Sequence, residues 1–282
     1  MRTFNLIAAA LLLAALAGCA KLNRGAVPLT GTAGCPSQTA AGLLAQQSKI
    51  GPQSPTDDLE CALAFLRRTH DPAVLKTSLP SRIVLHLAER ATDPKKREAL
   101  AAEGVRFAEE ALALGAVQDG AVHYYLAANL GLAVRDQMTL AVQNLPRLET
   151  EMKRAVELSL AIDGGGPLRL LGMLYLKAPP WPTGIGDSDK ALDLLKQAAQ
   201  QFPGHPLNHL FYAQALWEVD EDNAKDRVKA ELAAGKKKLA EGDWGYSKEP
   251  WAKEFAQFQK ELDDSGLSKA DASKAGSRRK QG

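Results

Sequence analysis

The sequence predicts an all-α fold, a body of packed helices, on three observations. From Thr56 onward there is no convincing alternation of apolar and polar residues, the pattern of a half-buried strand. Residues that start and end helices recur at regular intervals along the same part of the chain. A spacing of twelve residues separates Ala155 from Pro167 and again Ala191 from Pro203, which indicates a repeated helical unit.

Start and stop signals place the helices in order. Thr56 caps the first helix, and Pro72, Pro80 and Pro94 begin the next three. Pro146 lies inside a later long helix, where it removes one backbone hydrogen bond and is expected to bend the helix. The longer predicted helices cover approximately residues 56–70, 95–114, 119–135, 137–162, 223–241 and 250–262, with three more between 163 and 217.

The three helices between residues 163 and 217 carry the clearest pattern. The first has apolar residues at helical spacing and a glycine where a neighbouring helix must approach closely: Leu168, Leu171, Gly172 and Tyr175. The second has small and apolar residues before a proline: Ala191, Leu195, Ala198 and Pro203. This order is the tetratricopeptide pattern, in which paired helices bury their faces against the next pair. We therefore expect a tetratricopeptide-like helical-repeat solenoid of antiparallel helix hairpins over residues 56–264, ending in a charged terminal pair.

The segment from Leu176 to Asp187 is longer than the tight turn that normally joins two helices of a repeat. Trp181 lies in it between two prolines, which fix backbone angles around the ring. We expect a recognition loop in which Trp181 and Pro182 contact a partner or ligand; the alternative is that Trp181 folds back as a core residue. Gly184 and Gly186 are expected to supply positive backbone angles before a helix capped at Asp187.

Several motifs of this region occur together, namely DGGGP at residues 163–167, an LG.LY helix, the loop with tryptophan and prolines, and GD shortly before KAL. Together they resemble the helical lipoprotein that accompanies tripartite ATP-independent periplasmic (TRAP) transporters, a divergent tetratricopeptide family. The resemblance covers residues 121–240 well and extends more loosely from residue 55. It implies an accessory component of solute uptake that cooperates with a periplasmic solute-binding protein, offers a docking face and a ligand passage, and assembles into a small ring. Our first hypothesis is a non-enzymatic, lipid-anchored helical-repeat protein of the periplasm that binds a partner protein, a small apolar ligand, or both. The alternative is a tetratricopeptide lipoprotein that acts as scaffold or pilot in outer-membrane or secretin assembly.

The first residues have the order of a cleavable secretory signal, with a positive charge at Arg2, an apolar run, and Leu-Ala-Gly immediately before Cys19. This ending matches the lipobox of bacterial lipoproteins, in which the cysteine thiol receives a diacylglyceryl group. The apolar run is shorter than the ~20 residues that span a membrane. We expect a signal peptide over residues 1–18, lipid attachment at Cys19, and a flexible tether over 19–55. The family sorting rule for Ala20 indicates the periplasmic face of the outer membrane.

Export would place the remaining cysteines, Cys35 and Cys61, in an oxidising compartment, so they are expected to form a disulfide. The alternative is that Cys61 stays free and is buried as a small apolar residue. Without residues 1–18 the chain holds 34 basic and 33 acidic residues, so no strong field favours nucleic acid. Residues 265–282 carry a charge of +4 among Ser, Ala and Gly and are expected to be a disordered basic tail; the alternative is a tether to anionic lipid.

No set of acid, base and nucleophile is visible at motif spacing, so we expect neither an enzyme nor a cofactor. His205 and His209 have a spacing that can bind metal, but no Cys or acid completes the set locally, and we expect no metal site. The glycines of residues 164–166 lack the strand and the Lys-Ser/Thr of a phosphate loop and are expected to form a turn.

The aromatic residues Tyr124, Tyr125, Trp181 and Trp217 could line a ligand groove. Most are expected in the core, because Tyr125, Tyr175, Tyr212 and Trp217 recur at helical spacing. Besides Trp181 and Pro182, the candidates for ligand or partner binding are Tyr124 and Asn208.

Overall fold

The computed structural model describes residues 22, 25–30, 32, 34–219 and 223–265, and within them it contains twelve α-helices, two short 3-10 helices and no strand. The all-α prediction is therefore confirmed for this part of the chain. The predicted signal peptide, Cys19 and nearly all of the predicted basic tail lie outside the described residues. The elements are α2 (Ala40–Ala45), η2 (Gln47–Lys49), α3 (Thr56–Leu66), α4 (Pro72–Leu75), α5 (Leu79–Arg90), α6 (Pro94–Ala113), α7 (Gly120–Val134), α8 (Met138–Leu158), α9 (Gly166–Lys177), α10 (Ser188–Gln201), α11 (Pro206–Val219), α12 (Lys225–Glu241), η3 (Gly245–Ser247) and α13 (Lys248–Asp264).

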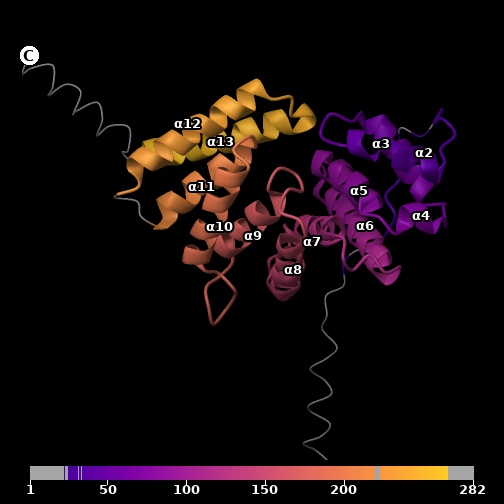
Figure 1. Ribbon diagram of the computed structural model, residues 1–282, viewed down its shortest axis with the longest axis horizontal. Coiled ribbons are helices and arrows are strands. Elements are labelled where there is room, and N and C mark those ends of the chain that lie inside the picture. Colours follow the sequence, from indigo (N-terminus) through magenta and orange to yellow (C-terminus); the bar gives the residue numbers. More distant parts are fainter. Residues whose placement is uncertain (1–21, 23–24, 31, 33, 220–222, 266–282) are drawn as a thin grey trace, which may run out of the picture.

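From α4 to α13 consecutive helices pack against each other along the chain (Figure 1), and a second set of contacts joins alternate helices. α5 contacts α7, α7 contacts α9, α9 contacts α11, and α11 contacts α13. These inner helices form one connected layer, while α6, α8, α10 and α12 each pack against the inner helices that precede and follow them. No helix among the described residues is both long and apolar enough to cross a membrane.

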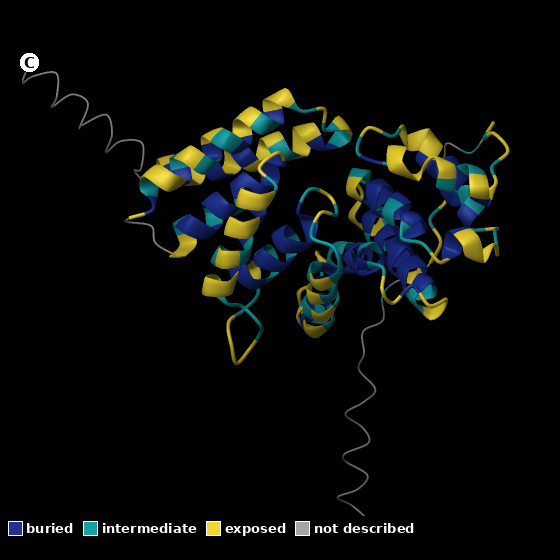
Figure 2. Cartoon of the chain, in the orientation of Figure 1, coloured by how far each residue is buried: buried dark blue, intermediate teal, exposed yellow. Residues whose placement is uncertain are grey.

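The composition of each helix explains its layer. α7 and α11 are apolar around most of their circumference and are largely buried, as expected for helices with neighbours on several sides (Figure 2). α10 buries only a stripe at helical spacing, made by Ala191, Leu195, Ala198 and Ala199. Gly172 permits the close approach that the sequence indicated, because a Cβ there would lie 2.6 Å from Cγ of Leu195.

Two helix ends differ from the predictions. α8 ends at Leu158 rather than near residue 162, because the chain leaves helical angles at Ser159. A turn follows, in which Asp163, Gly164 and Gly165 all have positive φ, and this is why glycines are needed there. Pro167, expected to close a helix, instead lies in the first turn of α9, where its missing N–H costs no hydrogen bond.

The prediction of a flexible tether over residues 19–55 is wrong for the described part of this segment, which is folded against the helices. Val27 accepts a hydrogen bond from Nη1 of Arg67 at 2.8 Å, and the backbone N–H of Thr30 donates to Oε2 of Glu60 at 2.8 Å. α2 and η2 lie in the same segment. The buried carboxylate of Glu60 and the guanidinium of Arg67 supply strong charge-assisted hydrogen bonds, a signal that composition alone does not reveal.

The C-terminal turn contacts the segment that precedes α3, so the two ends of the helical array meet. The backbone N–H of Tyr246 donates to the carbonyl of Pro52 at 3.2 Å, and the side-chain amide of Gln53 donates to the carbonyl of Asp243 at 2.5 Å. The hydroxyl of Tyr246 donates to Glu89 on α5. Desolvation around this contact raises the pKa of Tyr246.

His205 joins the turn before α11 to the last helix. Its ring centroid lies 5.3 Å from that of Trp244 and 5.1 Å from that of Trp251, and the two indoles are 5.4 Å apart. Burial lowers the pKa of His205 to about 2, so the imidazole is neutral in the folded protein.

This burial predicts a stability change in acid. The unfolded chain binds a proton at His205 below its ordinary pKa of ~6.5, whereas the folded protein does not. Protonation of His205 in the unfolded chain should therefore lower the free energy of unfolding by up to ~1.4 kcal/mol per pH unit as the pH drops below about 6.5. His205→Phe should make the decline shallower by that amount, measured by urea unfolding across the acid range.

His209→Gln is the matched control. Glu231 raises the pKa of His209 through a 2.7 Å contact, so this histidine stabilises the fold below its unfolded pKa, and the effect is lost as the pH rises through its folded pKa. The control should lower stability without changing the slope in acid. An unchanged slope in His205→Phe would contradict the prediction.

Candidate functional site

A cavity of about 550 Å³ lies between α5, α7, α8 and α9, and we call it the apolar cavity. Its size falls within the range of small-molecule sites in proteins. Most of its described wall is aliphatic, including Leu85, Leu132, Leu148, Met152, Leu170 and Met173. Such a wall binds by burying apolar surface.

Small residues on α7 explain why the space is left open. Ala127, Ala128 and Gly131 line the wall where large side chains would fill it. A Cβ added at Gly131 would meet only Cδ2 of Leu148, at an ordinary 3.8 Å. The cavity is open to solvent, since Met138 and Lys177 in its wall are largely exposed.

Charged groups lie around the apolar wall. Among the described lining residues these are Glu89, Arg135 and Lys177. Nε of Arg135 lies 3.7 Å from the carboxylate of Asp136, and Nζ of Lys177 lies 3.0 Å from that of Glu218. More than half of the side-chain surface of Arg135 and Lys177 is exposed, so both cations stand in solvent at the edge of the cavity.

A second cavity, of about 510 Å³, adjoins the first and has a more polar wall, and we call it the polar cavity. The two share Leu85, Glu89, Ala128 and Leu170. The remaining wall includes Arg82, His86, Tyr124, Asp163, Arg169 and Tyr246.

Beside the polar cavity, a buried hydrogen-bond network joins three inner helices to the glycine turn. Arg169, whose side chain is 3% exposed, contacts Oδ2 of Asp163 at 2.6 Å and donates to Oδ1 of Asn208 at 2.8 Å. The hydroxyl of Tyr124 donates to the same Asp163 oxygen at 2.8 Å. Burial, and then the charge of Asp163, raise the pKa of Tyr124, so its hydroxyl remains protonated.

The expectation that Asn208 binds a ligand or partner is wrong. Its side chain is fully buried, and its amide donates to the carbonyls of Gly164 at 2.9 Å and Phe202 at 2.8 Å. Tyr124 does line a cavity, together with Tyr125, but its hydroxyl is committed to Asp163. Sequence patterns do not distinguish a buried polar residue that closes a turn from one that binds a ligand.

Trp181 is 85% exposed, which excludes the alternative that it folds back into the core. Contact of Trp181 and Pro182 with a partner stays a prediction. The expected positive backbone angles at Gly184 and Gly186 are wrong. These glycines permit a close backbone approach instead, because a Cβ at Gly186 would lie 2.2 Å from the carbonyl oxygen of Ala178. Asp187 caps α10 as predicted, accepting from the backbone N–H of Lys190 at 3.0 Å.

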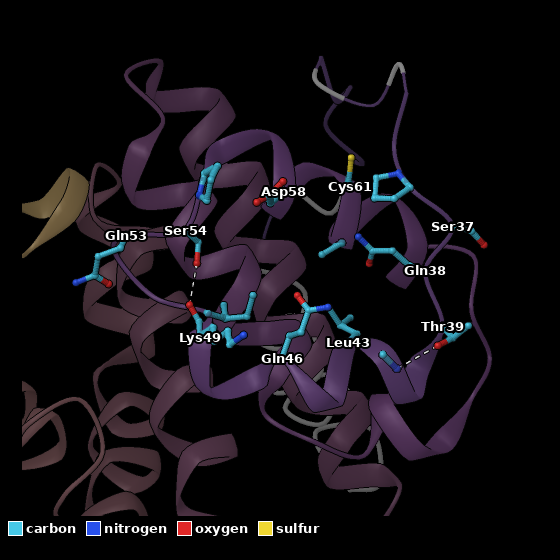
Figure 3. A pocket seen from close by; sticks show the side chains of 15 residues that line it. Ser37, Gln38, Thr39, Leu43, Gln46, Lys49, Gln53, Ser54, Asp58 and Cys61 are labelled. Carbon is cyan, nitrogen blue, oxygen red and sulfur yellow. Dashed lines mark hydrogen bonds between the residues drawn. The ribbon is translucent and has the colours of Figure 1, made fainter.

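A disulfide joins Cys35 to Cys61, the pair that the sequence indicated. Beside it lies a third cavity, of about 530 Å³, between the N-terminal segment and α3 (Figure 3). Two of its polar side chains serve local turns, since the hydroxyl of Ser54 donates to the carbonyl of Lys49, and that of Thr39 caps α2. This cavity is therefore a weaker candidate than the apolar cavity.

The two histidines that the sequence offered as metal ligands, His205 and His209, occupy structural positions. His205 packs between two tryptophans, and His209 contacts Glu231 at 2.7 Å and the carbonyl of Pro203 at 2.9 Å. In the part of the chain that the structure describes, no group of three or more His, Cys, Asp or Glu residues is arranged to hold a metal ion.

The residues of the apolar cavity were not predicted from the sequence. A local signal existed in the small residues Ala127, Ala128 and Gly131 within one otherwise apolar helix. No protein-family model matches the chain, and no match was found among curated proteins. Any inference about function therefore rests on the geometry above and on the motifs of the sequence.

Asn208→Ala should destabilise the protein by ~2–4 kcal/mol, because it leaves buried carbonyls and a donor of Arg169 without their partner. Urea unfolding measures the change. Asn144→Ala is the control, since that half-buried side chain makes one hydrogen bond, to the carbonyl of Leu140. A cost as small as that of the control would show that Asn208 is not structural.

Trp181→Ala should change the free energy of unfolding by less than about 0.5 kcal/mol, because the ring is exposed. Trp251→Ala should cost ~3 kcal/mol, because that half-buried ring packs against His205 and Trp244. Thermal unfolding compares the two. A large drop in the melting temperature of Trp181→Ala would contradict the exposed position.

Proposed function

We propose that this chain is a non-enzymatic, lipid-anchored helical-repeat protein of the periplasm that binds a small apolar ligand and cooperates with a partner protein. The observation that carries the proposal is the apolar cavity, about 550 Å³ of space walled mainly by aliphatic side chains from four helices. Each Å² of apolar surface buried there would stabilise a complex by ~25 cal/mol. Shape and apolarity would therefore select the ligand.

The packing supports a tetratricopeptide-like array. The inner helices contact one another in chain order, and an outer helix separates each from the next along the sequence. In helical-repeat proteins the surface made by successive units is the usual binding surface. The apolar cavity has this position, because α5, α7 and α9 are three successive inner helices and α8 connects the last two.

The motifs of the sequence supply the rest of the proposal. The lipobox at Cys19 would hold the protein at the outer membrane, and the resemblance to TRAP-associated lipoproteins points to a periplasmic solute-binding protein as partner. In this arrangement the chain contributes a binding site and a docking face to solute uptake, and no chemical step.

Gly131→Leu tests the cavity directly. The added side chain enters open space, and replacing a helical glycine favours the helix by ~1 kcal/mol, so the variant should fold. Binding of the apolar fluorescent probe N-phenyl-1-naphthylamine should weaken at least about tenfold, which is ~1.4 kcal/mol.

Gly131→Ala is the matched control, because one methyl group leaves most of the space open. Its affinity for the probe should stay close to that of the unmodified protein. Equal binding by Gly131→Leu and Gly131→Ala would place the probe elsewhere and remove the apolar cavity from the function.

A further inference from the structure

The start of the described chain lies against the junction of two hydrophobic clusters. One cluster centres on α7 to α13 and the other on α3 to α6. Leu22 and Leu132 are the two partly buried residues that pack against both. Leu132 also lines the apolar cavity, so the cavity borders the boundary between the two clusters, on which Leu22 packs as well.

Only two residues, Ala20 and Lys21, lie between Cys19 and Leu22. A fully extended chain spans at most ~3.6 Å per residue, so the Cα atom of the cysteine that would carry the lipid can be no more than about 11 Å from that of Leu22, a residue packed on the body. Nearby, Arg67 holds the carbonyl of Val27 at 2.8 Å. A lipid anchor at Cys19 would therefore keep this side of the protein against the bilayer.

The apolar cavity at this boundary is bordered by large exposed apolar residues. Of the six exposed large apolar side chains among the described residues, Met138 (79%) and Val142 (38%) line the apolar cavity. Trp181 (85%) follows two residues after Pro179, which lines it too. In Figure 1, α8 and the loop between α9 and α10 lie at the lower edge, opposite α12, and Figure 2 colours the tip of that loop as exposed.

The chemistry of this edge suits a lipid surface. Tryptophan prefers the headgroup region, where its amphipathic ring is half in contact with apolar chains. Arg135 and Lys177 stand at the edge of the cavity with exposed cationic groups, which can reach lipid phosphates while their stems cover apolar surface. Because the chain between Leu22 and Cys19 is short, a protein partner would find little room between this edge and the bilayer.

We propose that the edge formed by Met138, Val142 and Trp181 rests on the bilayer, so that the apolar cavity opens onto membrane lipid. This inference rests on the lipid anchor of the proposed function. It gives the apolar cavity a source of ligand, because an apolar molecule can enter from the membrane without crossing water. It also assigns the exposed Trp181 to lipid.

The test places the lipidated full chain in vesicles of phosphatidylethanolamine and phosphatidylglycerol that contain brominated lipid, which quenches tryptophan on contact. The fluorescence difference between the unmodified protein and Trp181→Phe isolates the emission of Trp181. Brominated lipid should reduce this emission about twofold or more, as for a ring in the headgroup region.

The control introduces Lys237→Trp into Trp181→Phe. Lys237 lies on α12, its side chain is 71% exposed, and a tryptophan there should not be quenched. Flotation with the vesicles measures membrane attachment separately from orientation. Protein that does not float is not anchored, and this result would contradict both the lipid anchor and the orientation that depends on it. Protein that floats with an unquenched Trp181, or with equal quenching at both positions, would overturn this inference and leave the anchor in place.

Discussion

The structure depends on one buried charge. Arg169 is 3% exposed, and a buried guanidinium is tolerated only when it has hydrogen-bond acceptors and a partner of opposite charge. Asp163, in the glycine turn, forms an ion pair with Arg169. Asn208 accepts a hydrogen bond from Arg169 and donates one to the carbonyl of Gly164, which links the same turn to α11. Tyr124 brings α7 to the same carboxylate. The network thereby fixes α7, α9 and α11 around one turn, and two of these helices, α7 and α9, line both the apolar and the polar cavity.

The fixed spacing gives the cavity its character. Where α9 meets α10 the packing is close, because a Cβ at Gly172 would already overlap Leu195. Where α7 presents Ala127, Ala128 and Gly131 the same spacing leaves a gap, which the aliphatic chains around it do not fill. Apolar side chains in the wall of an open cleft face water, which is less favourable than burial. A ligand that covers this wall would give the cleft a function.

Local signals predicted much of the molecule, because they act within a few residues. Asp187 caps a helix through its own side chain, and the turn at Gly164 needs positive φ that glycine adopts freely. The exposed ring of Trp181 was indicated by flanking prolines and by the lack of a packing position in the repeat. These signals predict the ends of helices less well, since α8 ends at Leu158 and not near residue 162.

The sequence by itself determined that the chain folds as helices, where most of them begin, and which two cysteines were left to pair. Only the tertiary structure decided that Asn208 is structural, that the segment holding Val27 is docked, and that small residues of α7 border a cavity. The physical reason is distance along the chain. Helix periodicity and capping are settled between near neighbours, whereas a hydrogen bond from Arg67 to Val27, or a void between α5 and α9, exists only once remote segments have met.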